Sequence, residues 1–331
     1  MIKLTRRVFA TSAAAAAVSA GFGIKLSRAQ ANYPARPVTI LVPWAAGGAT
    51  DAVTRMIASL LEKDLGQPFN VINRTGGSGV VGHSAIAGSA PDGYTLGMIT
   101  IEVGMMHWQG ISELKPANYT ALALMSEDPP GVLVNTESPY KTVKELAEAI
   151  KASPAGKFKG SGAGQGSIWH LALVGWLQAM GIKGDHVRWV PSNGGAPALQ
   201  ELAAGGVDVV TCSVPEGRAM MDAGKVRALA AMARERNPQF ASVPTLKEGL
   251  GVEFSLGSWR GVAGPRGLPQ PVVDKLAGAL KKVQESKDFR DFMNARGFAL
   301  VWADAPGFTK FMDDDNARMG ALLKAAGLAK T

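Results

Sequence analysis

The sequence predicts an α/β protein made of two domains. Short apolar runs alternate with amphipathic helical patterns, and this alternation occurs in two separate blocks of the chain. With 331 residues, 47% hydrophobic and 19% charged, the chain has enough apolar material for one large core or two medium ones. This composition excludes a disordered chain and a coiled coil.

The first block has the rhythm of a βαβ unit. An apolar run at 38–42 precedes a helical pattern through Val53 and Leu61, which Gly66 ends. Two further strand-like runs, 69–72 and 94–99, follow. This order predicts a mostly parallel sheet.

The second block begins near residues 132–134. Thr142 and Glu145 form a capping box that opens a helix to about Ala152. The remaining expected elements are a strand at 157–160, a helix at 168–180, a strand at 187–190, a helix at 197–204 and a strand at 207–212.

Beyond Lys225 the pattern becomes mainly helical. Strands are expected at 226–232 and 258–263, and helices at 271–285, 289–295 and 306–326. Because helices with an apolar stripe need a sheet to cover, this tail should pack back on the first unit. We therefore expect one domain from 32–131 and 254–331, and a second from 132–253.

Residues 1–31 are typical of a signal peptide. A basic start is followed by an Ala-rich apolar run and by a small-x-small cleavage site at 29–31. The segment 5–9, Thr-Arg-Arg-Val-Phe, indicates a twin-arginine signal, with an ordinary Sec signal as the alternative. The twin-arginine interpretation implies a bacterial protein that is exported across the inner membrane.

Most of the basic charge belongs to this leader. Its five basic residues, with no acid, account for five of the eight net positive charges and leave +3 on the mature chain. So small a charge gives no electrostatic reason to expect nucleic acid or an anionic membrane as a partner.

Cysteine and histidine give no sign of metal or redox chemistry. Cys212 is the single cysteine and follows a strand-like run, which indicates an inert buried thiol. The four histidines lack the spacing of metal ligands. No metal site is expected.

Three glycine-rich turns carry the functional signal. They occupy residues 43–51, 161–167 and 192–197, each between a predicted strand and a predicted helix. Free backbone N–H groups and the helix dipole favour an anion there, at the strand ends where α/β sheets bind ligands. Any one of them is also compatible with a simple tight connection.

Known phosphate and hydrolase motifs do not fit these turns. Gly162, Gly164 and Gly166 miss the dinucleotide spacing because position 167 is serine, and no P-loop occurs. The run 76–79 lacks the strand that a nucleophile elbow requires. The expected anion is therefore small, and is held rather than transformed.

Six motifs follow one another along the chain: YPARP at 33–37, VPWAAGGxxD at 42–51, NRxGGxG at 73–79, PDGYTL at 91–96, GSxxHL at 166–171 and PALxxLxxGGVD at 197–208. Together they resemble the Bug/TctC family, the periplasmic solute-binding proteins of tripartite tricarboxylate transporters. The resemblance implies a type II Venus-flytrap fold in the periplasm, with a ligand carboxylate gripped in a cleft between the domains. It also implies no cofactor and an inner-membrane permease as partner. Trp44 and the pair Ser192-Asn193 depart from the common family pattern, so the ligand's identity does not transfer.

The turns supply the candidate ligand contacts. Backbone amides from two facing turns would hold one carboxylate, and closure would exclude water and strengthen these bonds. Asp51 is open to two interpretations, a charge that complements its helix N-terminus or a ligand contact. Thr100 and Ser213 end strands at plausible cleft positions. The candidates are Trp44, Ala45, Ala46, Gly47, Gly48, Asp51, Thr100, Gly162, Gly164, Gln165, Gly166, Ser167, Asn193, Gly194 and Ser213.

Two rival functions stay open at this point. A binding protein for another transporter type would differ only in its partner. A periplasmic enzyme acting on a small carboxylic acid would need a pair of titratable groups in the cleft, and the candidate turns offer only Asp51. We expect a binding protein and a monomer.

Overall fold

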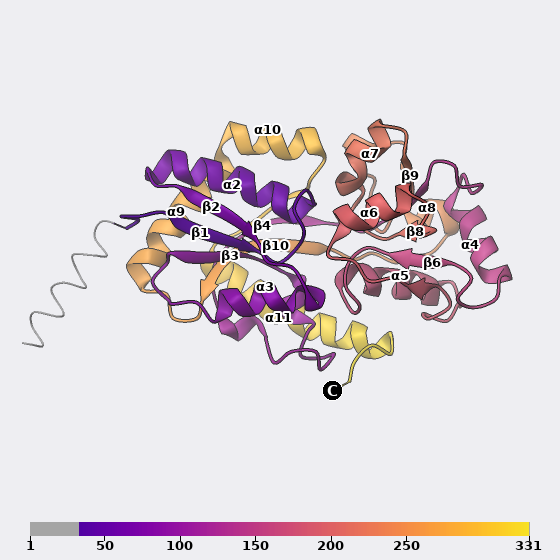
Figure 1. Ribbon diagram of the computed structural model, residues 1–331, viewed down its shortest axis with the longest axis horizontal. Coiled ribbons are helices and arrows are strands. Elements are labelled where there is room, and N and C mark those ends of the chain that lie inside the picture. The colour runs from indigo at the N-terminus through magenta and orange to yellow at the C-terminus, as the bar shows by residue number, and fades with distance from the viewer. Residues whose placement is uncertain (1–32, 331) are drawn as a thin grey trace, which may run out of the picture.

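The computed structural model describes residues 33–330 and has two lobes, each built on its own sheet (Figure 1). The expected signal peptide, its cleavage site and the twin-arginine motif lie outside the described residues. Among residues 33–330, no helix is long and apolar enough to cross a membrane.

The first lobe contains a six-stranded mixed sheet. β1 pairs in parallel with β2 and β3, whereas β10 runs antiparallel to both of its neighbours. The expected parallel order therefore holds at the N-terminal edge only. In spatial order the strands are β11 (Leu300–Ala303), β4 (Tyr119–Asp128), β10 (Ser258–Pro265), β3 (Thr95–Thr100), β1 (Val38–Val42) and β2 (Phe69–Asn73).

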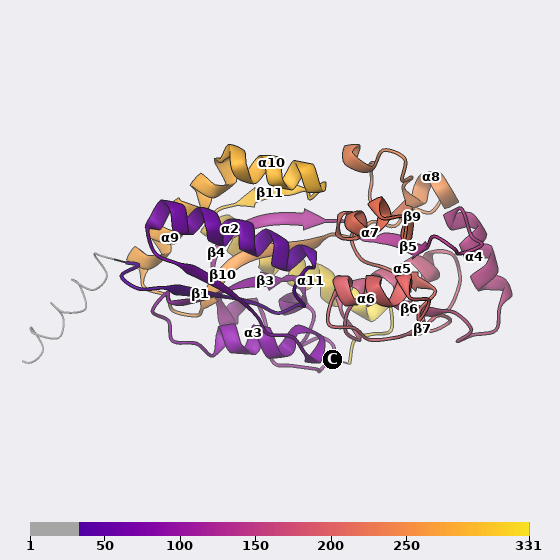
Figure 2. The same cartoon turned by 45° about the horizontal axis from the view of Figure 1, so that its top comes forward.

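Helices cover both faces of this sheet (Figures 1 and 2). Helices α2, α9 and α10 pack together on one face, while α3 and α11 contact the other. The expected return of the C-terminal helices to the first unit is confirmed by these contacts. The bounds are α2 (Ala49–Leu65), η1 (Gly77–Gly79), α3 (Val80–Ala87), η2 (Ile101–Gly104), η3 (Pro116–Asn118), α9 (Gln270–Glu285), α10 (Lys287–Arg296) and α11 (Ala305–Ala325).

The second lobe contains a five-stranded sheet of shorter strands. In spatial order these are β7 (Arg188–Trp189), β6 (Lys159–Ser161), β8 (Val209–Val210), β5 (Gly131–Asn135) and β9 (Val226–Ala231). Its helices are α4 (Val143–Ala152), α5 (Ile168–Ala179), α6 (Gly195–Ala203), η4 (Val214–Gly217), α7 (Arg218–Asp222), η5 (Pro238–Phe240) and α8 (Leu246–Leu250).

Local sequence signals explain several of these boundaries. The capping box at α4 is confirmed, because the Thr142 side chain accepts from the Glu145 amide while the Glu145 side chain bonds back. Gly66 ends α2 with φ of 71°, a conformation that glycine adopts without strain. Cys212 is fully buried, as expected for a core thiol.

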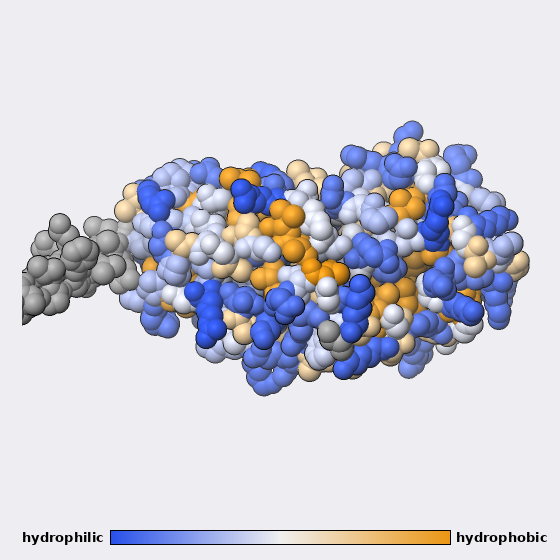
Figure 3. Space-filling view, turned by 60° about the horizontal axis from the view of Figure 1, so that its bottom comes forward, coloured by the Kyte–Doolittle hydropathy of each residue, from blue (hydrophilic) through white to orange (hydrophobic). Residues whose placement is uncertain are grey.

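The chain passes between the lobes twice. β4 leads directly into β5, and the segment after β9 returns to β10, so that the first lobe is assembled from both ends of the described chain. Figure 3 shows one face of the molecule as mostly hydrophilic, with apolar side chains gathered in patches near its middle.

Candidate functional site

Three helix N-termini meet at one small cavity between the lobes. Helix α2 begins after Gly48 in the first lobe, and helices α5 and α6 begin after Ser167 and Gly194 in the second. The cavity has a volume of about 20 Å³. It is lined by Trp44, Ala45, Gly48, Thr50, Thr100, Glu102, Ile168, Trp169, Gly194, Gly195, Glu216, Ser258 and Arg260.

Hydrogen bonds tie the two lobes together at this cavity. The Ala45 amide donates to the Asn193 carbonyl at 2.9 Å. The Ala49 amide donates to Glu216 Oε1 at 3.1 Å, and the Ile168 amide donates to Glu102 Oε1 at 3.2 Å. Each glutamate thus crosses the cleft and accepts from the first turn of a helix in the opposite lobe.

The structure brings only part of the predicted contact set to the cavity. Trp44, Ala45, Gly48, Thr100 and Gly194 are among its lining residues. The other candidates are not: Ala46, Gly47, Asp51, Gly162, Gly164, Gln165, Gly166, Ser167, Asn193 and Ser213.

Trp44 forms one wall of the cavity. Its indole Nε1 donates to Thr100 Oγ1 at 3.2 Å, and its carbonyl accepts from Asn73 Nδ2 at 3.0 Å. A Cβ at Gly79 would lie 3.1 Å from the indole, so this glycine lets the ring sit against α3. These contacts fix the ring beside the N-terminus of α2.

Asp51 belongs to a network behind the turn. Its carboxylate accepts from Arg55 Nε at 3.0 Å, from Asn73 Nδ2 at 2.9 Å and from the Gly47 amide at 3.0 Å. Burial alone would raise the pKa of Asp51, but these bonds outweigh it and lower the pKa. Of its two interpretations, these contacts favour support of the helix N-terminus.

The second glycine-rich turn contacts the first lobe through its backbone. The Gln165 carbonyl accepts from Ser78 Oγ at 2.8 Å, and the Gly166 carbonyl accepts from Gln109 Nε2 at 2.7 Å. A Cβ at Gly164 would lie 2.3 Å from Ser78 Oγ. Glycine is therefore required here by the close approach of the other lobe.

Ser167 acts as the N-cap of α5. It is fully buried, and its hydroxyl accepts from the His170 amide at 3.5 Å. His170 Nδ1 accepts from the Gly166 amide, which gives that histidine a structural role in the turn.

The sequence interpretation missed three charged side chains that line the cavity. Glu102 lies in η2, two residues beyond Thr100, and Glu216 lies in η4, three residues beyond Ser213. Arg260 lies in β10, and its Nη1 donates to Asp128 Oδ2 at 2.5 Å. A charged residue just beyond a predicted buried strand is the signal that could have found the two glutamates.

Burial dominates the electrostatics of the two glutamates. It raises the pKa of Glu102, although bonds from the Thr100 hydroxyl and the Ile168 amide oppose this shift. Burial also raises the pKa of Glu216, while nearby Arg260 and the Ala49 amide act in the opposite direction. The cleft therefore holds two perturbed carboxyls, so a scarcity of titratable groups no longer counts against catalysis.

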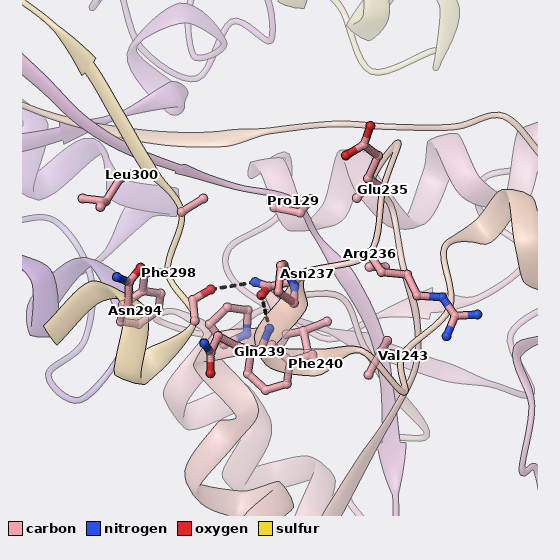
Figure 4. A pocket seen from close by; sticks show the side chains of 17 residues that line it. Pro129, Glu235, Arg236, Asn237, Gln239, Phe240, Val243, Asn294, Phe298 and Leu300 are labelled. Atoms are coloured by element: carbon pink, nitrogen blue, oxygen red, sulfur yellow. Dashed lines mark hydrogen bonds between the residues drawn. The ribbon is translucent and has the colours of Figure 1, made fainter. Parts of the chain in front are cut away.

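A larger cavity, of about 410 Å³, lies elsewhere between the lobes (Figure 4). Asn237 Nδ2 crosses it to donate to the Gly297 carbonyl at 2.7 Å. Phe240, Val243 and Phe298 give it largely apolar walls. Among residues 33–330, no helix of eight or more residues begins at the lining of this cavity, so the smaller, polar cavity is the better candidate for the functional site.

The sequence model of the tripartite tricarboxylate transporter family receptor, TctC, matches residues 53–328. The chain belongs to the TctC family. A Cupriavidus necator protein described as lying in the gbd 5′ region is 31% identical over 337 residues, 99% of each chain.

Solved structures agree with this family. The periplasmic binding protein BugD superposes with a TM-score of 0.84 at 28% identity, over 90% of this chain and 100% of BugD. MatC of Rhodopseudomonas palustris, solved with bound malate, gives 0.80 at 28% identity, over 88% of this chain and 100% of MatC. This TctC protein is thus a solute-binding protein of the periplasmic type.

Proposed function

We propose that this protein captures a small carboxylate between its lobes with backbone amides and delivers it to the permease of a tripartite tricarboxylate transporter. The observation that carries the proposal is the convergence of α2, α5 and α6 on one cavity. Each N-terminus presents unpaired N–H groups and a partial positive charge, which suit an anion.

Backbone donors are available at each of these termini. Within residues 33–330, no acceptor is hydrogen-bonded to the amides of Gly48, Trp169 or Gly195, all of which line the cavity. A carboxylate that accepted from them would gain charge-assisted bonds in a site shielded from water. The malate bound to MatC supports a carboxylate as the class of solute.

We propose that the two lobes move as domains, 32–131 with 254–331 and 132–253. The connections between β4 and β5 and between β9 and β10 would act as the hinge. Glutamates, amides and carbonyls bridge the lobes in this structure, and these bonds support the proposal that it corresponds to the closed arrangement. Opening would separate these pairs and admit the solute.

The test is a thermal-shift and calorimetric screen of the mature protein against mono-, di- and tricarboxylates. A true solute at ~100 times its dissociation constant adds about 2.7 kcal/mol to the free energy of unfolding. Its binding should also reduce the radius of gyration in solution scattering. No response to any carboxylate would refute the proposed capture.

The partner and the oligomeric state follow from the same mechanism. A monomer that closes on its solute would present both lobes to the permease at once, so the closed, loaded form should bind the permease more tightly than the empty form. The test is solute uptake by membrane vesicles that contain the permease, with and without the solute-loaded protein. Uptake that requires the protein would support this step. Uptake that is the same without the protein would indicate that it serves another transporter.

The leader is proposed to direct export by the twin-arginine route. Changing Arg6 and Arg7 to lysine should leave the precursor inside the cell. Normal secretion of this double variant would show that Sec carries the protein instead.

A further inference from the structure

The charges that line the cavity are unbalanced. Glu102 from the first lobe and Glu216 from the second both face it, together with a single cation, Arg260. The Arg260 guanidinium is already paired with Asp128, and both partners are almost fully buried. Among residues 33–330, neither glutamate forms an ion pair.

Glu216 also has an unused acceptor. Its Oε1 accepts from the Ala49 amide, but its Oε2 is buried and has no hydrogen-bond partner among the described residues. A Cβ at Gly195 would lie 2.5 Å from Oε2, and a Cβ at Gly48 would lie 2.8 Å from Oε1. The absence of side chains at Gly48 and Gly195 thus allows this carboxylate to lie against two helix N-termini. Its Oε2 has no donor among the described residues.

Glu102 differs from Glu216 because both of its carboxylate oxygens accept a hydrogen bond. Thr100 Oγ1 donates to Oε2 at 2.5 Å, and the Ile168 amide donates to Oε1. These bonds fix a carboxylate that is only 3% exposed on the wall of the cavity. When ionised, it adds a second negative charge to that of Glu216, and a cationic group between the two would offset the burial that raises the pKa of both.

We infer that the solute carries a protonated nitrogen besides its carboxylate, and that this nitrogen binds Glu216 Oε2 with Glu102 as the second negative charge. The inference rests on the proposed function and narrows its class of solute. An ammonium group has three donors and no acceptor, which complements an orphaned carboxylate oxygen. A solute with only carboxylates would bring further negative charge against two buried ones, which disfavours it.

The test compares matched pairs of probes on the wild-type mature protein by calorimetry. Each pair has the same carbon skeleton and differs by an amine: succinate and aspartate, glutarate and glutamate, butyrate and 4-aminobutyrate, 4-methylbenzoate and 4-(aminomethyl)benzoate. We expect at least one amine-bearing probe to bind tenfold or more tightly than its plain partner. Plain carboxylates that bind as well as or better than their partners would overturn the inference and leave the proposed function standing.

A near-isosteric variant sharpens the result. Glu216→Gln should weaken the preferred amine-bearing probe at least tenfold and strengthen its plain partner, whereas the exposed Glu148→Gln should change neither. Equal binding of the amine-bearing probe to wild type and Glu216→Gln would overturn the inference. If no probe of either kind binds to wild type, the proposed function fails and the inference fails with it.

Discussion

Two of the cavities that lie between the lobes differ in size and in chemistry. The larger has about 410 Å³ and apolar walls, whereas the smaller has about 20 Å³ and is surrounded by helix N-termini, two glutamates and an arginine. The smaller one is small because Glu102 and Glu216 reach across the cleft and bond to the helix N-termini opposite. Convergent polar groups are therefore a better guide to the site than empty volume.

One ion pair lies between the two cavities. Arg260 lines the polar cavity, while its partner Asp128 accepts from the amide of Ala299, which lines the apolar one. Asp128 also immediately precedes Pro129, another residue of the apolar wall. Both cavities thus contact the same buried pair, which lies at the start of the first connection between the lobes.

The largest expected effect comes from breaking this pair. Asp128→Asn leaves the buried Arg260 guanidinium without its ion-pair partner and should lower the free energy of unfolding by about 3–5 kcal/mol. Urea denaturation measures the loss. Asp64→Asn, which breaks the exposed pair with Lys282, should cost under about 1 kcal/mol. Equal costs for both variants would show that the buried Arg260–Asp128 pair contributes no more to stability than an exposed one.

Acid should destabilise the protein through a histidine beside the polar cavity. Burial lowers the pKa of His83 to about 4, and His83 Nε2 accepts from the amide of Thr100, a lining residue. The unfolded chain binds a proton at this histidine near pH 6.5, whereas the folded chain binds it only near pH 4. The contribution of His83 to the free energy of unfolding should therefore be fully present above pH 6.5 and be lost as the pH falls from 6.5 to 4.

His83 alone should contribute up to about 3 kcal/mol to this decline. Chemical denaturation across this pH range should show a flatter profile for His83→Gln than for wild type. A variant profile as steep as that of wild type would assign the acid sensitivity to other groups.

A side chain added at the polar cavity should cost affinity. In Gly48→Val the new Cβ would meet Glu216 Oε1, and the branched chain would cover the N-terminus of α2. We expect at least a tenfold loss of solute affinity, about 1.4 kcal/mol, by titration calorimetry. Val243→Ala, in the apolar cavity, should stay within about twofold of wild type. A larger loss of solute affinity in Val243→Ala than in Gly48→Val would indicate that the solute binds in the larger cavity.

The smallest effect is expected at Ser167. Because its hydroxyl caps α5, Ser167→Ala should lower the free energy of unfolding by about 1 kcal/mol. Thr142→Ala removes the cap of α4, away from the cavity, and should cost about the same. Thermal denaturation compares the two. Solute affinity lost only in the Ser167 variant would show that this hydroxyl touches the solute.

Local sequence signals were sufficient for much of the fold. The glycine-rich turns do lie at the N-termini of α2, α5 and α6, because strand, turn and helix signals act over a few neighbouring residues. Strand direction was harder to predict. β10 has the apolar pattern of any buried strand, and only its pairing with β3 and β4 makes it antiparallel.

The charged part of the cavity could not be predicted in the same way. Glu102, Glu216 and Arg260 come from η2, η4 and β10, which are distant in sequence and meet only in the folded structure. No spacing rule joins such residues. The second turn is rich in glycine because Ser78 and Gln109 of the other lobe lie close against its backbone. Local sequence does not encode these contacts.

The position of β10 in the sheet affects the order in which the two lobes can fold. This strand lies between β3 and β4, so a chain emerging from the ribosome exposes one edge of each until residues 258–265 are made. The complete sequence of the second lobe is synthesised before that gap can be filled. Such long-range pairing slows folding and makes the first lobe the later one to mature.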